Sequence, residues 1–334
     1  MNPRLHTTLS GIALASALCL VPLTASAQQK KPLLPDGYPA KPVRIIVSTS
    51  PGGGLDIVMR AVATRLSEKL GTAFVVDNQG GASGAIAVNM VAAAAPDGYT
   101  LLCTGGTTLI NAVFRKFERD IRQSLAPVVR MSSSYYFLIL PTHVPATNIR
   151  EFIAYAKSRP GALNYGSNGV GSVIHLGLEM IETGAGVDMA HVPYKGVGQV
   201  NIDLAAGRLD VGLVSLSGIQ VVKAGKARII ATSMPQRHPD HPDVPTIAEA
   251  IIPGYDVANT YMLYAPVQTP APIIAALNRE AIQVLAAPEM KDKLAADGAI
   301  SAPPYPPDEL KKLFIVDFNR WEAVIRKAGV KPED

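Results

Sequence analysis

The chain has 334 residues, a formal net charge of +4 at pH 7 and 17% charged residues. A balance this close to neutral excludes the strongly basic surface typical of nucleic-acid-binding and membrane-surface-binding proteins, although a small positive excess suits an anionic ligand. The length is sufficient for two domains, each with a hydrophobic core.

The N-terminal 27 residues predict export. Arg4 provides a short positive region, residues 9–23 form an apolar run without charge, and Ala25-Ser26-Ala27 is a small-x-small cleavage site before Gln28. The apolar run is shorter than the roughly 20 residues that a membrane-spanning helix needs. We therefore expect a signal peptide over 1–27 and a mature, periplasmic chain that begins near Gln28.

Two cysteines bear on this prediction. Cys19 leaves open a lipoprotein signal, in which this residue would be acylated, although Leu18 stands where such signals have a small residue. Removal of the signal leaves Cys103, which lies in the apolar run 99–103. A lone thiol cannot form an internal disulfide, so we expect Cys103 to be a small buried side chain.

In the mature chain, predicted strands and helices alternate. After a Pro-rich segment over 28–41, runs rich in Val and Ile predict strands, and apolar residues three or four apart predict helices. The expected strands are 43–47, 73–76, 99–103, 136–140, 163–165, 189–193, 211–214, 228–232 and 257–265. The expected helices are 56–70, 84–95, 147–159, 172–183, 197–206 and 308–328. This order predicts a parallel sheet covered by helices on both faces, with Trp321 in the core.

The alternating pattern restarts after residue 131, which predicts two α/β lobes. Domain I would comprise 28–131 plus 253–334, and domain II, inserted in it, would comprise 132–252. The chain would then cross between the lobes near 132–140 and near 257–265. Two crossings make a hinge, so the cleft between the lobes is the expected ligand site.

A glycine-rich loop, Thr49-Ser-Pro-Gly-Gly-Gly-Leu-Asp56, follows the first strand and opens a helix. Glycines such as Gly53 and Gly54 allow a ligand to approach the backbone N–H groups closely. The helix N-terminus adds unpaired donors and partial positive charge, so the loop suits an anion. We expect Asp56 to cap this helix.

The second lobe contains a loop of the same design, Gly166-Ser-Asn-Gly-Val-Gly-Ser172, between a strand and a helix. One such loop is weak evidence, because many helices begin after a glycine. Two loops, one in each lobe, could present donors to a shared cleft. Together they would grip a small carboxylate from both sides.

Cofactor and metal sites are poorly supported. Ile57 occupies the third glycine position of G-x-G-x-x-G, and no G-K-[ST] follows, so we expect no nucleotide cofactor. His238 and His241 lie in a loop broken by prolines and without further metal-ligand residues, so we expect solvated surface there and no metal. His175 and His191 are expected to be packing residues.

Nucleophilic catalysis has little support, because the chain lacks a G-x-S-x-G elbow. A secreted serine-type hydrolase that uses Ser172 or Ser215 remains the alternative from another class. A second alternative is an orphan binding protein that passes its signal to a sensing partner instead of a transporter.

The motifs together resemble the Bug family, the substrate-binding receptors of tripartite tricarboxylate transporters. The resemblance covers essentially the whole mature chain and rests on Tyr38-Pro-Ala-Lys-Pro-Val-Arg44, Pro51-Gly-Gly-Gly-Leu-Asp56, Ala95-Pro-Asp-Gly-Tyr-Thr-Leu101, Gly169-Val-Gly-Ser-Val-Ile-His-Leu176, His191-Val-Pro-Tyr-Lys-Gly196, Lys223-Ala-Gly-Lys226, Pro242-Asp-Val-Pro-Thr246 and Ala265-Pro266. It implies a type II periplasmic-binding-protein fold that holds a carboxylated ligand between the two glycine-rich loops.

The resemblance also implies site residues. The expected ligand site comprises Thr49, Gly53, Gly54, Asp56, Thr104, Asn168, Gly169, Ser172, Tyr194, Ser215 and Tyr261. The chain departs from the family at Thr49, where an aromatic residue is usual, and at 211–215, where Phe-Asp is frequent. The missing acid argues against amino-acid ligands. We expect a monomeric binding protein, not an enzyme, that delivers a small organic acid to inner-membrane transporter subunits.

Overall fold

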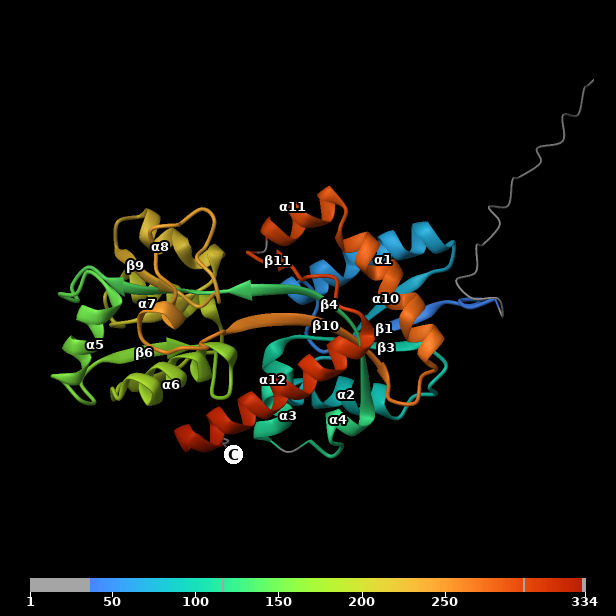
Figure 1. Ribbon diagram of the computed structural model, residues 1–334, viewed down its shortest axis with the longest axis horizontal. Coiled ribbons are helices and arrows are strands. Elements are labelled where there is room, and N and C mark those ends of the chain that lie inside the picture. The colour runs from blue at the N-terminus through green and yellow to red at the C-terminus, as the bar shows by residue number, and fades with distance from the viewer. Residues whose placement is uncertain (1–36, 116, 297, 332–334) are drawn as a thin grey trace, which may run out of the picture.

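The computed structural model describes residues 37–331 apart from residues 116 and 297. The predicted signal peptide and Cys19 lie outside the described residues. The chain forms two α/β bodies, here called lobe I and lobe II, which strands β4 (Leu125–Tyr135) and β10 (Ala258–Pro266) connect (Figure 1). None of the helices between residues 37 and 331 has the length and hydropathy of a membrane span.

Lobe I is built on a six-stranded sheet in the order β11-β4-β10-β3-β1-β2. Its further strands are β1 (Val43–Val47), β2 (Phe74–Asn78), β3 (Thr100–Thr104) and β11 (Ile300–Ser301). The prediction of a parallel sheet holds for β1 with β2 and β3, but it is wrong for β10, which is antiparallel to both β3 and β4. The reason is topological: the chain leaves lobe I along β4 and returns along β10, so these two strands run in opposite directions.

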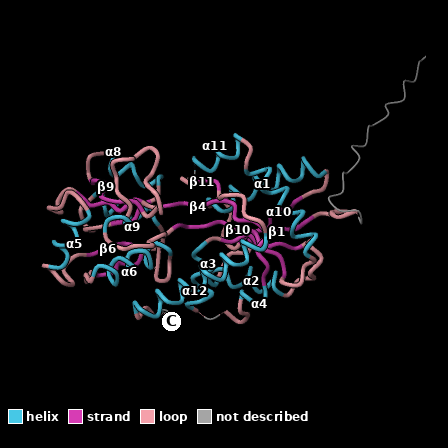
Figure 2. Tube along the Cα trace, viewed as in Figure 1, coloured by secondary structure: helices cyan, strands magenta, loops and turns pink. Residues whose placement is uncertain are grey.

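Helices cover both faces of this sheet (Figure 2). One face packs against α1 (Gly54–Leu70), α10 (Ala271–Leu285) and α11 (Pro288–Ala296). The other packs against α2 (Ala85–Ala92), α3 (Gly106–Phe114) and α12 (Pro307–Ala328), with η1 (Ala82–Gly84) and α4 (Ile121–Ser124) beside them. Trp321 is 3% exposed and belongs to this core, as predicted. Cys103 is buried in β3, and burial raises the pKa of its thiol far above the ordinary value.

Lobe II contains a three-stranded and a two-stranded sheet, β8-β5-β9 and β6-β7, which the Tyr165–Val211 bridge joins edge to edge. Its strands are β5 (Phe137–Pro141), β6 (Asn164–Ser167), β7 (Ala190–Pro193), β8 (Gly212–Val214) and β9 (Ala227–Thr232). Its helices are α5 (Ile149–Lys157), α6 (Val173–Ala185), α7 (Val197–Ala205), η2 (Leu216–Ile219), α8 (Gln220–Lys223) and α9 (Ile247–Ala250).

The two chain crossings are tied together by one buried serine. Tyr136 stands between β4 and β5, and its backbone N–H donates to the Ser233 hydroxyl over 2.9 Å. That hydroxyl donates in turn to the Val257 carbonyl, just before β10, over 2.6 Å. A second connection runs along α12, which extends from lobe I to contact α6 of lobe II (Figure 1). The lobes are therefore joined at a narrow hinge and by one long helix.

Candidate ligand-binding site

Two adjoining cavities, of about 220 and 440 Å³, are lined by residues of both lobes. They have five residues in common, three from helical or loop segments and two from β10: Gly54, Thr107, Asn168, Asn259 and Tyr261. The smaller cavity extends toward lobe II and the larger toward lobe I. Because they share these walls, we treat them as one interlobe site, here called the ligand cleft.

The N-termini of five helices converge on the ligand cleft. Gly54 at the start of α1 and the capping residues of α2 and α3, Gly84 and Gly105, line it from lobe I. Val173 and Val197, the first residues of α6 and α7, line it from lobe II. Each helix N-terminus presents unpaired backbone donors and the positive end of a dipole. The ligand cleft is therefore suited to an anion.

The caps of these helices leave most of those donors available. Glycine caps α1, α2, α3 and α7, so no capping side chain accepts a hydrogen bond from their first turns. In α3 the Gly106 N–H is taken by the side chain of Asn259. Among the described residues that line the cleft, none is Asp, Glu, Lys or Arg. A bound anion would therefore be held by backbone N–H groups and by neutral side chains such as Asn168 and Tyr261, without a countercharge.

The first glycine-rich loop is supported by a buried carboxylate. Asp56 is 3% exposed and accepts hydrogen bonds from the Gly52 N–H and from the Asn78 amide, both over 2.9 Å. It also forms an ion pair with Arg60 at 2.9 Å. Burial alone would raise the pKa of Asp56, but Gly52, Arg60 and Asn78 outweigh it and hold this pKa below its ordinary value. The expected cap is wrong in detail: Gly53 is the capping residue, and Asp56 braces the loop from the first turn.

The second glycine-rich loop is supported by imidazoles. The Gly171 N–H donates to Nδ1 of His175 over 3.1 Å, and the Ser167 hydroxyl lies 2.7 Å from Nε2 of His191. The two rings stack with their centroids 3.9 Å apart. Burial, with the neighbouring His175, lowers the pKa of His191 to about 4. Both histidines are thus packing residues, and they also fix the shape of the loop.

The structure places the predicted site residues in two sets. Six line the ligand cleft: Thr49, Gly53, Gly54, Asn168, Ser215 and Tyr261. Five others stand behind it: Asp56, Thr104, Gly169, Ser172 and Tyr194. The Thr104 hydroxyl lies 2.9 Å from that of Ser48, which lines the cleft, and Tyr194 donates to Asp203 over 2.7 Å. Ser172 caps α6 through a hydrogen bond from the backbone N–H of His175.

Sequence reasoning missed several lining residues. Asn259 of β10 accepts a hydrogen bond from the Gly106 N–H over 3.0 Å and so positions the start of α3. Two further glycine-containing segments also line the cleft, the first through Gly80, Gly81 and Gly84 and the second through Gly105 and Thr107. The second of these follows a strand and opens a helix, as the first loop does, so the same signal could have identified it. Ser134 and Tyr136 had no such signal, because only the path of β4 brings them to the cleft.

The histidines outside the cleft differ from expectation in one respect. His238 and His241 pack on Phe137, with ring centroids 5.3 and 5.2 Å from it, so this loop is more than solvated surface. Within the described part of the chain, no group of three or more His, Cys, Asp or Glu residues is placed to hold a metal ion.

The comparison with known families decides the family of the chain. The model for the tripartite tricarboxylate transporter family receptor matches residues 58–330. The chain belongs to this family. The predicted resemblance to Bug proteins and the predicted α/β periplasmic-binding-protein fold of type II are thereby confirmed.

Individual relatives support the same assignment. Protein BugT of Bordetella pertussis is 30% identical over 313 residues, which cover 92% of this chain and 95% of that protein. The structure of R. palustris Rpa4515 with adipate has 32% identity and a TM-score of 0.71, covering 89% of this chain and 100% of that one. MatC from Rhodopseudomonas palustris with bound malate has 30% identity and a TM-score of 0.70, covering 86% and 100%.

This receptor is a solute-binding protein of a periplasmic family and not an enzyme. The alternative of a secreted serine hydrolase is therefore wrong. The geometry agrees, because the Ser172 hydroxyl accepts its hydrogen bond from the backbone of His175, whereas the His175 imidazole accepts from Gly171. A serine nucleophile would need an imidazole or carboxylate base beside its hydroxyl.

Proposed function

We propose that the protein captures a small organic acid, with one or two carboxylates, in the ligand cleft and delivers it to inner-membrane subunits of a tripartite transporter. The observation that carries the proposal is the convergence of five helix N-termini on a cleft in which no described lining residue is charged. Family membership supports the transport role. The structures of relatives with adipate and malate support a carboxylate as the ligand class.

In this proposal the cleft-lining residues Thr49, Gly53, Gly54, Asn168 and Tyr261 contact the acid, together with Ser215. Backbone N–H groups at the helix starts would receive the carboxylate oxygens in charge-assisted hydrogen bonds, each worth about 1.5–3 kcal/mol. The other predicted residues, Asp56, Thr104, Gly169, Ser172 and Tyr194, would act behind the cleft, by holding the loops in place.

A thermal-shift screen against mono-, di- and tricarboxylic acids tests this function. An acid present at 100 times its Kd should stabilise the protein by about 2.7 kcal/mol. Amines and amides of the same carbon skeleton serve as matched neutral or cationic controls and should leave the melting temperature unchanged. Stabilisation by the amines instead of the acids would show that the cleft is not an anion site.

Capture should also close the lobes. We propose that they move about the two crossings near 132–140 and 257–265, with domain I as 28–131 plus 253–334 and domain II as 132–252. The hydrogen bonds of Ser233, which join Tyr136 and Val257, support a pivot at this place. Moving the lobes from mostly open to mostly closed, from 1:99 to 99:1, takes about 5.5 kcal/mol of differential affinity. Small-angle scattering should then show a smaller radius of gyration with the acid than without it, and identical curves would refute the hinge.

Export to the periplasm is the remaining part of the proposal. The family supports this location, and the predicted cleavage between Ala27 and Gln28 would release a soluble mature protein. N-terminal sequencing of the protein from a periplasmic extract should begin at or near Gln28. An N-terminal lipid on Cys19 would instead show a membrane-anchored receptor.

A further inference from the structure

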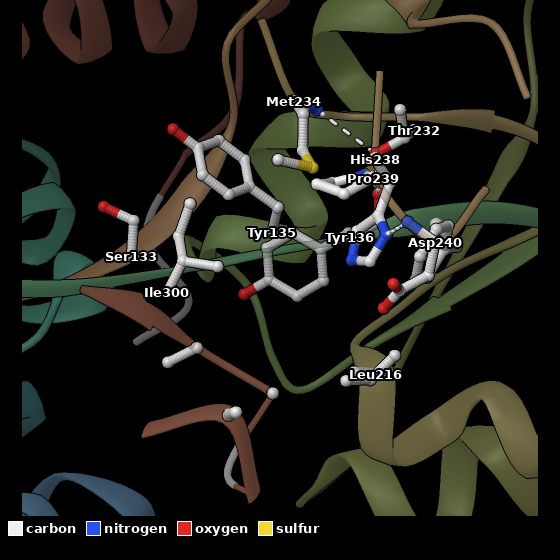
Figure 3. A pocket seen from close by; sticks show the side chains of 14 residues that line it. Ser133, Tyr135, Tyr136, Leu216, Thr232, Met234, His238, Pro239, Asp240 and Ile300 are labelled. Atoms are coloured by element: carbon white, nitrogen blue, oxygen red, sulfur yellow. Dashed lines mark hydrogen bonds between the residues drawn. The ribbon is translucent and has the colours of Figure 1, made fainter. Parts of the chain in front are cut away.

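A third cavity, of about 300 Å³, lies beside the hinge (Figure 3). Tyr136 is a wall of both this cavity and the ligand cleft. Ser133 and Tyr135 line the new cavity, whereas Ser134 lines the cleft. Successive side chains of a strand point to opposite faces, so the end of β4 separates the two spaces. We call this third space the hinge pocket.

Both lobes build the hinge pocket. Lobe I contributes Ala295 of α11, Gly298, Ala299, and Ile300 of β11. Lobe II contributes Leu216, Thr232, Met234 and the loop 238–240. The two sides meet closely at one place, because a Cβ added to Gly298 would lie 2.9 Å from Cβ of Leu216. A molecule in the pocket would therefore touch both lobes at once.

The chemistry of the hinge pocket is the reverse of that of the ligand cleft. Most of its lining is aromatic or aliphatic, with Tyr136, Phe137, Met234 and Ile300 among these residues. Among the described residues that line it, Asp240 is the formally charged side chain, since burial lowers the pKa of His238 below its ordinary value and favours the neutral ring. The five helices whose N-termini point at the cleft, α1, α2, α3, α6 and α7, contribute no described residue to the lining of this pocket.

The loop that carries Asp240 is held in a defined place. His238 and His241 pack on Phe137 in tilted and edge-on orientations, and their own ring centroids lie 5.4 Å apart. The Asp240 N–H donates to Nδ1 of His238 over 3.1 Å. These contacts hold the backbone of Asp240 at the rim of an apolar cavity, as Figure 3 shows. Asp240 is exposed, and a carboxylate at this place attracts a cation and repels an acid.

We propose that the hinge pocket is a second ligand site, which binds a small planar aromatic cation such as an arylamidine or arylamine. The ring would lie against Tyr136 and Met234, and its charged group would face Asp240. The volume is at the lower end of the range for small-molecule sites, which fits one ring with a short substituent. This inference goes beyond the proposed function, because the ligand has the opposite charge to the acid and occupies a different space.

Occupancy of the hinge pocket would influence acid capture. A molecule that touches both lobes changes the free-energy difference between their relative positions, provided that the pocket changes shape when the lobes move. By linkage, the acid must then change the affinity for the aromatic cation by the same factor. The hinge pocket is thus a regulatory site for the receptor.

Benzamidine and benzoate form a matched pair of probes, since they share one ring and carry opposite charges. Isothermal titration of the mature protein should show one benzamidine site, and benzoate should not compete for it. Asp240→Asn should weaken benzamidine binding at least fivefold. Asp243→Asn, which removes a charge from the same surface loop but not from the pocket, should leave it unchanged.

A second variant fills the pocket instead of changing its charge. Ile300 is 47% exposed at the edge of the sheet, so Ile300→Trp should fold normally, occupy the space and abolish benzamidine binding. Val316→Trp, at an exposed position of α12 outside the pocket, is its control. Equal affinity in wild type and Asp240→Asn, or competition by benzoate, would overturn the proposal. Neither result depends on which acid, if any, binds the ligand cleft.

Discussion

The two glycine-rich loops of the ligand cleft present the same surface but are supported in different ways. The first rests on a charged group, the Asp56 carboxylate with Arg60 and Asn78. The second rests on neutral groups, the stacked imidazoles of His175 and His191. Their helices differ as well, because glycine caps α1 and serine caps α6. A strand–glycine–helix pattern thus indicates where the binding surface lies. It does not indicate which side chains hold the loop in place.

The difference has a consequence for pH. A carboxylate brace is lost only when acid protonates Asp56, whose pKa is held below its ordinary value. An imidazole brace requires a lone pair on Nδ1 of His175 to accept from Gly171. Burial lowers the pKa of the stacked His191 to about 4, so that ring stays neutral well below pH 7.

The largest loss of stability should come from removing Asp56, the charged group that supports the first loop. Asp56→Ala leaves the Gly52 N–H, the Asn78 amide and the Arg60 guanidinium without their common acceptor inside the fold. We expect a loss of about 3 kcal/mol in the free energy of unfolding, because hydrogen bonds to a buried charge are among the strongest. Urea denaturation measures it. Asp243→Ala, on an exposed loop, is the control and should change stability by less than about 0.5 kcal/mol.

Removing an imidazole that supports the second loop should reduce the free energy of unfolding by a smaller amount. His175→Leu fills a similar volume but leaves the buried Gly171 N–H without an acceptor, so we expect a loss of about 2 kcal/mol. The affinity for the acid identified by the screen should fall about tenfold, which corresponds to about 1.4 kcal/mol. His143→Leu, at an exposed histidine, is the matched control. This variant should bind the acid with the same affinity as wild type. Equal affinity in both variants would mean that the second loop does not need its imidazole.

Two opposing titrations in lobe II give the third prediction. The folded pKa of His191, about 4, lies below its ordinary value of 6.5, so its stabilisation is complete above pH 6.5 and is lost as pH falls toward 4. Burial raises the pKa of Glu182 to about 7, so this group stabilises the fold below pH 4.5 and loses that contribution as pH rises toward 7. Between pH 6.5 and 4.5 the two slopes oppose each other.

Urea midpoints at several pH values separate these two groups. Compared with wild type, His191→Gln should become relatively more stable as pH falls from 6.5 to 4.5. Glu182→Gln should become relatively less stable over the same interval. Both trends have the sign that follows from the shifted pKa values, and parallel curves for the three proteins would contradict the assignment. Over this interval the linkage effect of either group is at most about 2 kcal/mol, which is comparable to the loss expected for His175→Leu.

The smallest change in stability should come from making the first loop resemble the second. Gly53 has φ −78° and space around an added Cβ, whose nearest neighbour would be the Ser50 carbonyl at 3.9 Å. Gly53→Ser should therefore fold well and gain only a few tenths of a kcal/mol from a side-chain cap. Its hydroxyl would compete with the acid for the same backbone donors, so acid affinity should fall about threefold. Gly225→Asn, at a distant positive-φ glycine, is the control for calorimetric titration.

Local patterns predicted much of this molecule. The apolar spacing of residues 56–70 and the Gly71 stop predicted α1 to within two residues at its start and at the correct end. The two glycine-rich loops were identified because strand, glycine and helix follow one another directly in the chain. In contrast, α3, α10 and α11 were missed. The strand β4 was missed as well, because an isolated pattern does not reveal a strand that belongs to one sheet up to Tyr135 and leads directly into a strand of another.

Non-local geometry explains the rest of the differences. Ser172 and Asp56 were placed in the predicted ligand site because they lie in the correct loops. Both side chains are buried and accept hydrogen bonds from backbone N–H groups of those loops and helix starts. Asn259 was missed because it comes from β10, 153 residues away from its partner Gly106. The direction of a side chain within a loop depends on contacts with distant segments, which a single sequence does not display.

The lone thiol of β3 makes lobe movement accessible to spectroscopy. Cys103 has no exposed surface and is held as an unreactive thiol, and it is the one free cysteine among residues 37–331. A maleimide dye would therefore react with engineered surface cysteines and leave Cys103 untouched. One new cysteine on α5 and another on α10 would report the distance between the lobes in single molecules, and no native residue would need to be removed first.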